Sequence, residues 1–243
     1  MKISQLFYVV IFTLISSLSH SQSIGFTAGY GFINMGEVNS DLKTSYTSFA
    51  SFGAFSSPPK ELNGNLFLEG NVKFGIANFN LGVSGNYISS TGSFSYSDEV
   101  GFFEENYDVS TAEVVGLVEI LIVERSIVQP FLQLAAGVGF AKAEHIGALR
   151  IYSDPSYDLD VKNTVEGSYF AGRIKGGLQF LVQNFVFEIG LGYRLANAGE
   201  LVGDHVENGV TYKDMPVRDI NGNDIGFDYS GVFLTGGISI MIL

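Results

Sequence analysis

The stretch that decides the fold is FVFEIGLGYR, Phe185 to Arg194, an apolar segment that nevertheless carries two charged residues. Its side chains alternate with period two, one set apolar or aromatic and the other small or charged. A β-strand directs successive side chains to opposite faces, so one face of this strand is hydrophobic while Glu188 lies on the other. The alternation predicts a strand between an oily and a polar environment.

The preceding segment, residues 169–182, alternates in the same way, and only Gln183 and Asn184 separate it from Phe185. Two residues are enough to connect the strands of a β-hairpin. In that hairpin Gln179 lies opposite Glu188, so polar meets polar, and the register is well specified. The remaining opposed pairs are apolar: Val182 with Phe185, Phe180 with Phe187, and Leu178 with Ile189.

Six further segments alternate similarly. Along the chain, the connections between the expected strands are alternately long and polar or short. In every strand the larger apolar face is opposed by Gly, Ser, Asn and charged residues. A soluble barrel would be polar outside, whereas a barrel in a membrane is apolar outside and polar inside. We therefore expect an all-β fold, an eight-stranded antiparallel up-and-down transmembrane β-barrel. A ten-stranded barrel is the alternative, if residues 45–55 form an extra hairpin.

Residues 1–21 are predicted to be a secretory signal peptide. Lys2 precedes the apolar run LFYVVIFTLI, and Ser19 and Ser21 supply small residues at the cleavage site. An uncleaved anchor is the alternative, although a spanning helix needs about 20 apolar residues. The mature chain would be residues 22–243.

Composition excludes several classes of protein. The chain has no cysteine, so disulfides, thiolate metal sites and an N-terminal lipid-modified cysteine are excluded. Its formal net charge is −12, and it becomes −13 once residues 1–21, with their single lysine, are removed. An acidic chain without a basic cluster is a poor nucleic-acid binder.

Four long polar segments are expected to be extracellular loops, at about residues 36–64, 90–110, 142–167 and 196–226. Loops on a rigid barrel are where a binding function would lie. Most acidic residues fall in these loops. They would form a solvated rim, or would bind divalent cations that bridge them to anionic lipid headgroups, or a cationic partner.

A smaller set of charged residues is predicted to face the barrel interior. An eight-stranded barrel is just wide enough for side chains to fill it, so buried charges there must pair. Three acids and four bases allow such pairing. The set forms either a structural plug or the lining of a narrow pore. Its members are Glu69, Lys73, Glu119, Arg173, Lys175, Glu188 and Arg194.

We expect no catalytic residue, no cofactor and no metal site. His145 and His205 fall in the expected loops, without a serine at a recognisable spacing. The stretch DINGNDIG, residues 219–226, is similar to a calcium-binding loop but has Asp224 where glycine is required and Ser230 where the bidentate acid belongs. An Asx-rich turn explains it better.

Taken together, the signal sequence, the eight alternating strands and the terminal strand resemble small OmpA/OmpX-type barrels of the porin-like "outer membrane protein β-barrel domain" superfamily. The resemblance covers residues 22–243. It implies a monomer in the outer membrane of a Gram-negative cell, surrounded by outer-membrane lipids and inserted by the barrel-assembly machinery. The chain departs from the group by ending in Leu243, where an aromatic residue is usual.

The sequence favours a structural or loop-mediated binding role, without enzymatic activity. A narrow porin-like channel for small solutes is the second hypothesis. A lipid-modifying outer-membrane enzyme, using a histidine at the outer rim, is the third.

Overall fold

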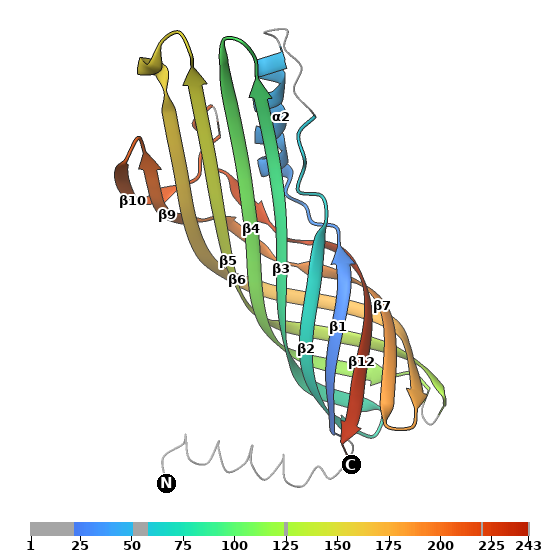
Figure 1. Cartoon of the computed structure of the whole chain (residues 1–243). Helices are drawn as coiled ribbons and strands as arrows, with labels where there is room; N and C mark the ends of the chain where they lie inside the picture. Colours follow the sequence, from blue (N-terminus) through green and yellow to red (C-terminus); the bar gives the residue numbers. More distant parts are fainter. Residues whose placement is uncertain (1–21, 51–57, 124–125, 220, 243) are drawn as a thin grey trace, which may run out of the picture.

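The computed structural model describes residues 22–50, 58–123, 126–219 and 221–242. The predicted signal peptide and Leu243 lie outside the described residues. The described residues form mainly one long antiparallel sheet, with one α-helix beside it (Figure 1).

Eight strands close into a ring, in the order β1, β2, β3, β4, β5, β6, β7, β12 and back to β1. The predicted eight-stranded antiparallel barrel is therefore confirmed. The ten-stranded alternative is wrong, because residues 45–50 belong to a helix and no further strand enters the ring within the described chain. The strands are β1 Gln22–Gly31, β2 Asn65–Ile76, β3 Phe79–Ser97, β4 Gly101–Leu121, β5 Val128–Ile151, β6 Leu159–Val182, β7 Phe185–Leu195 and β12 Gly231–Ile242.

The hairpin of β6 and β7 has the register predicted from the sequence, with Gln179 opposite Glu188 and Val182 opposite Phe185. Its two-residue turn places Gln183 at φ 56°, and the matching turn between β2 and β3 places Ala77 at φ 54°. Positive φ is the conformation that tight hairpin turns require. Both short turns lie at the same end of the barrel as the start of β1 and the end of β12 (Figure 1).

The outer surface of the ring is apolar and the inner surface is polar. Val83 and Leu134 are more than half exposed, whereas the interior Glu119 is fully buried. We call this apolar outer surface of the ring the apolar belt. Its exposure is favourable in hydrocarbon and unfavourable in water. Ring closure also satisfies the backbone amides, which lipid cannot do. Among the described helices, none has the length and hydropathy needed to cross a bilayer.

The apolar belt ends at a defined level on the four longest strands. On β5 the outward residues change from Phe140 to Lys142, and on β3 they change from Tyr87 to Ser89. Beyond this level β3 to β6 continue, and β5 adds ten residues, or about 30 Å of strand. The segments 90–110 and 142–167, expected to be polar loops, are therefore largely continuous β-hairpins.

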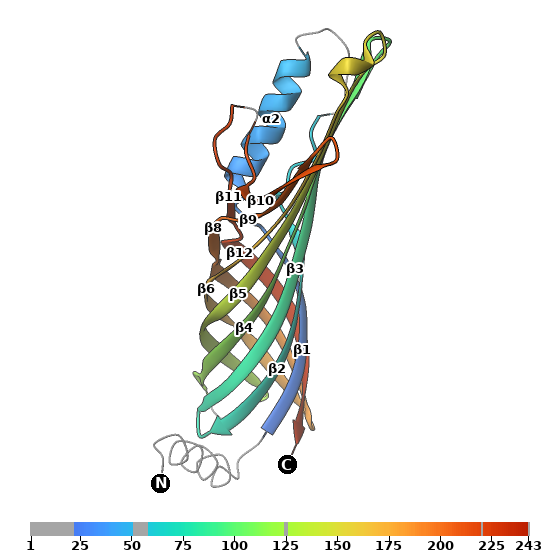
Figure 2. The same ribbon diagram turned by 90° about the vertical axis from the view of Figure 1, so that its left-hand side faces the viewer.

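In this extramembrane sheet the two faces exchange character. The inward face carries buried Phe94, Tyr107 and Val109, while the outward face carries ion pairs such as Glu144 with Lys162 at 2.5 Å. Figure 2 shows the helix α2, Gly36–Ala50, standing beside this sheet. The remaining elements are η1 Pro155–Tyr157, β8 Asn197–Glu200, β9 Val202–Glu207, β10 Val210–Pro216 and β11 Gly226–Asp228.

Packing and one side-chain clamp hold α2 in place. Val38 and Leu42 lie one turn apart on the same face and are completely buried. Asn39 accepts a hydrogen bond from the Leu62 amide at 2.8 Å, and its own amide group lies 3.4 Å from the Leu62 carbonyl. A helix this rich in Ser and Thr depends on such tertiary contacts, since helix propensity alone is weak.

The upper boundary of the apolar belt can be tested by placing an arginine at one position within the belt and at another position above it. Ile189→Arg, at the centre of the β7 outer face, should reduce folding into lipid vesicles, because a mid-membrane charge costs about 2–4 kcal/mol. Ile146→Arg, on the outward face of β5 above the belt, should fold like the parent. The measurement is the folded fraction on cold SDS gels. Equal yields for the two variants would contradict the assigned boundary.

Candidate functional site

All seven charged residues predicted to face the lumen do so, and all are buried. Lys73 of β2 lies at the centre of the lower cluster, with its Nζ 2.5 Å from Glu119 of β4 and 3.5 Å from Glu188 of β7. Lys175 of β6 contacts the same Glu188 at 2.6 Å. Gln179 donates to Glu119 at 3.0 Å. Each carboxylate is thus shared by donors from several strands.

A second ion pair crosses the whole lumen. Arg173 of β6 pairs with Glu69 of β2, and these strands lie four places apart in the eight-strand ring, on opposite sides. The other Arg173 nitrogen, Nη2, donates to Ser84 Oγ at 2.7 Å, and the guanidinium lies 5.7 Å from the centre of the Phe67 ring. This pair acts as a strut between opposite walls.

The sequence prediction missed one interior acid, Glu113 of β4. It accepts hydrogen bonds from Asn86 at 2.8 Å and from the Tyr169 hydroxyl at 2.8 Å. The signal was present, because Glu113 and Glu119 lie six residues apart on one strand and share a face. With it, four acids face four bases. Arg194 instead donates to the Tyr229 carbonyl, at 2.9 Å from Nε.

Aromatic side chains fill the lumen beside Arg173, Glu113 and Arg194. Phe67 stacks on Phe233 with ring centres 5.6 Å apart, and Tyr169 stacks on Tyr229 at 6.2 Å. Buried residues from the segment between β7 and β12 pack in the same hydrophobic cluster: Ala196, Leu201, Val217, Ile225, Phe227 and Tyr229. At the other end, a cavity of about 170 Å³ lies beside Lys73 and Glu119.

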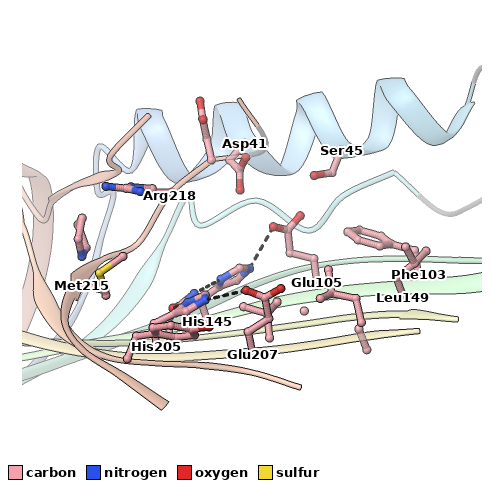
Figure 3. Close-up of a pocket in the computed structure, with 18 residues that line it drawn as sticks. Asp41, Ser45, Phe103, Glu105, His145, Leu149, His205, Glu207, Met215 and Arg218 are labelled. Atoms are coloured by element: carbon pink, nitrogen blue, oxygen red, sulfur yellow. Dashed lines mark hydrogen bonds and ion pairs between the residues drawn. The ribbon is translucent and has the colours of Figure 1, made fainter. Parts of the chain in front are cut away.

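A larger cavity lies above the barrel. It has a volume of about 590 Å³ and is bounded by α2, by the inward face of the extended β4 to β6, and by the β9–β10 hairpin with the residues that follow (Figure 3). Much of its wall is apolar, and charged and histidine side chains gather on part of it. The apolar residues include Phe103, Leu149, Leu159, Val161, Met215 and Pro216.

One row of side chains crosses five strands beneath this cavity. Tyr107 of β4, His145 of β5, Asn163 of β6, His205 of β9 and Tyr212 of β10 are directly opposed from strand to strand. Asn163 links the two histidines, with Nδ2 2.9 Å from His145 Nδ1 and Oδ1 2.5 Å from His205 Nδ1. Tyr107 stacks on His145 with ring centres 4.3 Å apart. The row is therefore fixed by strand register as well as by its hydrogen bonds.

Carboxylates stand at both ends of the hydrogen-bonded histidines. Glu105 Oε1 lies 3.1 Å from His145 Nε2, and Glu207 lies 3.6 Å from His205 Nε2 (Figure 3). Burial raises the pKa of Glu105, but the hydrogen bond from His145, with smaller contributions from the nearby Ser45 and Asp41 side chains, outweighs burial and leaves that pKa below its ordinary value. Glu105 is therefore a carboxylate at neutral pH.

Tyr107 has the opposite shift. Burial, together with the Glu105 and Asp41 carboxylates, raises the pKa of Tyr107 well above its ordinary value. The phenol therefore stays protonated and donates to Asp41 Oδ2 of α2 at 2.7 Å. This bond ties the helix to the sheet at the cavity wall.

The expectation that the two histidines lie in loops is wrong, since both are on strands and are brought together by one asparagine. The Asx-turn prediction for residues 219–226 is confirmed, because Asp219 accepts from the amides of Asn221 and Asn223 at 2.9 and 2.7 Å. The Asn223 side chain also donates to Asp219, at 3.0 Å. This bond, together with the two amide bonds, lowers the pKa of Asp219.

Many of the acidic residues expected to form a solvated rim have defined partners. Asp160 pairs with Arg150 at 2.5 Å, and Asp204 pairs with Lys213 at 2.7 Å. Asp98 accepts from the amides of Val100 and Gly101 in the β3–β4 turn. Across the described residues, no group of three or more His, Asp or Glu side chains is arranged to hold a metal ion.

No family model matches the chain, and no curated protein matches it. Among solved structures it is similar to the attachment invasion locus protein Ail of Yersinia pestis, with 13% identity over 92% of this chain and 99% of that one, and a TM-score of 0.41. It is also similar to Neisserial surface protein A (9%, 90% and 96%, TM-score 0.37) and to the outer membrane protease OmpT of Escherichia coli (8%, 93% and 98%, TM-score 0.28). All three are small outer-membrane β-barrel proteins. Such distant matches say nothing about activity, and the fold assignment rests on the ring and belt themselves.

The strut across the lumen gives a testable stability effect. Arg173→Met leaves Glu69 buried without its partner and should lower the free energy of unfolding by about 3–5 kcal/mol. Adding Glu69→Gln should restore much of that loss. Urea titration in lipid vesicles, read by gel migration, measures both variants.

The control is Lys142→Met, which breaks the exposed pair with Glu166 on the outer face at 3.6 Å. It should cost no more than about 1 kcal/mol. If Arg173→Met were no more harmful than Lys142→Met, the pair would not be a structural strut.

Proposed function

We propose that the chain is an exported outer-membrane barrel that binds a small ligand in its extramembrane cavity, while its lumen serves as a structural plug. The observation that carries this proposal is the cavity of about 590 Å³, which lies within the range of about 300–1,000 Å³ typical of ligand sites. Apolar walls combined with a few convergent polar groups are typical of such sites as well.

The lumen supports this choice over a channel. Glu69 and Arg173 span it, Lys73 joins two further walls, and stacked aromatic rings also fill it. A solute would have to break buried ion pairs to pass, which costs several kcal/mol. Binding therefore fits better than conduction.

The surroundings of His145 also favour binding over lipid modification. Both ring nitrogens of His145 are engaged, one by Glu105 and one by Asn163, and the residue is buried. Such a histidine is suited to holding a rigid wall.

The mature protein would act as a monomer in the outer membrane after signal-peptide cleavage and insertion by the barrel-assembly machinery, with outer-membrane lipids around its belt. Divalent cations at exposed acidic residues are a secondary proposal.

Planar-bilayer recording tests the plugged lumen. The purified parent protein should give no stable single-channel steps, because the ion pairs and aromatic layers fill the barrel. An open porin under the same conditions is the positive control. Reproducible steps whose size changes in Lys73→Met would mean that solutes pass the charge cluster, and the channel hypothesis would replace the proposed one.

Titration calorimetry of the protein in lipid nanodiscs tests the cavity. Neutral 4-phenylbutanol should bind with a dissociation constant of about 1 mM or lower, corresponding to about 4 kcal/mol. Empty nanodiscs supply the lipid-partition background. Gly147→Trp should abolish the signal, because Gly147 lines the cavity and the nearest atoms to an added Cβ are 3.9 Å away. Binding that is absent, or unaffected by this filled cavity, would refute the proposed function.

A further inference from the structure

The Asn163 bridge determines which histidine nitrogens carry hydrogen. Glu105 is a carboxylate and can only accept, so His145 must present Nε2–H to it. In a neutral imidazole the other nitrogen is then an acceptor, which requires the Asn163 amino group to face His145 Nδ1. The Asn163 carbonyl must consequently accept from His205 Nδ1–H. In a neutral His205 ring, Nε2 is then the acceptor nitrogen.

Two polar positions at the cavity are therefore acceptors that lack a good donor. Glu105 Oε2 has no hydrogen-bond partner among the described residues, although the Glu105 side chain is only 7% exposed. His205 Nε2 lies 3.6 Å from Glu207, too far for a good hydrogen bond, and two atoms that both accept cannot satisfy each other. A buried acceptor left unpaired is unfavourable, and a ligand that brings donors removes that cost.

We propose that the cavity takes a ligand carrying a protonated amino or guanidino group on an apolar body, with the cation placed against Glu105 and the His205–Glu207 pair. This inference rests on the proposed function and names its ligand class. The source of the cation, a free amine or a basic side chain of a peptide, is left to the test.

The other charged groups of the cavity agree with this class. Asp41 and Asp219 add two more carboxylates to its wall, and they come from α2 and from the turn after β10. Arg218 is the one guanidinium among its lining residues, and it pairs with Asp224 at 2.9 Å. An anionic headgroup would meet four carboxylates and is disfavoured by charge alone.

The apolar wall sets the rest of the ligand. Phe103 and Leu149 lie on adjacent extended strands at one side, and Met215 and Pro216 lie at the end of β10. Methionine adapts to ligands of irregular shape. A purely hydrophilic polyamine would leave this surface uncovered, so the body of the ligand should be hydrocarbon or aromatic.

A matched series of three probes tests the class: 4-phenylbutylamine, 4-phenylbutanol and 4-phenylbutyrate, which share one body and differ in the head group. Calorimetry in nanodiscs should rank the amine first, tighter than the alcohol by about tenfold, as expected for one desolvated charged hydrogen bond. Glu105→Gln should remove most of that preference, so that the amine and the alcohol bind with nearly equal affinity. The control Glu166→Gln, on the outward face of the same sheet, should leave the ranking unchanged.

Two results separate failure of this inference from failure of the proposed function. In the first result, the alcohol or the butyrate binds as tightly as the amine, and Gly147→Trp still blocks this binding. That result would overturn the ligand class but not the binding cavity. No probe binding in the cavity would overturn both.

A lysine-containing tripeptide with flanking leucines, compared with its acetyl-lysine form, distinguishes the sources. If the peptide competes with the amine only when the lysine is charged, a basic side chain is an accepted source, and if it never competes, the ligand is a free amine.

Discussion

The constraint behind the whole structure is that a backbone amide in hydrocarbon must find its partner within the protein. For a sheet this means closure, and the pairing of β12 with both β7 and β1 supplies it. Closure with eight strands fixes a narrow interior, which must be filled by side chains. The inward charges then have to pair across the lumen, as Glu69 and Arg173 do. Because the lumen is filled, we place the proposed binding function in the extramembrane half.

The sequence could predict the ring because its apolar and polar faces alternate against a uniform environment. The register of β6 with β7, and the inward position of residues such as Lys73 and Glu188, follow from that alternation alone. Glu113 was missed although it obeys the same parity. The helix α2 was not predicted, since Ser and Thr residues dominate its sequence and its stability comes from contacts with distant strands.

The extended hairpins were misread for a different physical reason. Above the belt, water replaces lipid outside, and the apolar face of each strand turns inward, so the pattern reverses partway along one continuous strand. The run Ser93, Phe94, Ser95, Tyr96, Ser97 still alternates, and in the structure its aromatic residues are the buried ones. Reading such a segment requires knowing where the membrane ends. The sequence marks that level only by changes of outward residue, from Phe140 to Lys142 on β5 and from Tyr87 to Ser89 on β3.

The candidate site is the consequence of that reversal. Once β4, β5 and β6 continue past the belt, their register alone brings Tyr107, His145 and Asn163 side by side, and β9 adds His205. These residues are far apart in the chain, so no local motif could reveal them. The inward face that carries them is covered by α2 through the bond from Tyr107 to Asp41, while the neighbouring space toward β10 stays open as a cavity. Apolar side chains in that space could not supply a donor to the second Glu105 carboxylate oxygen, which has no hydrogen-bond partner, so a continuous apolar core is unfavourable at this position.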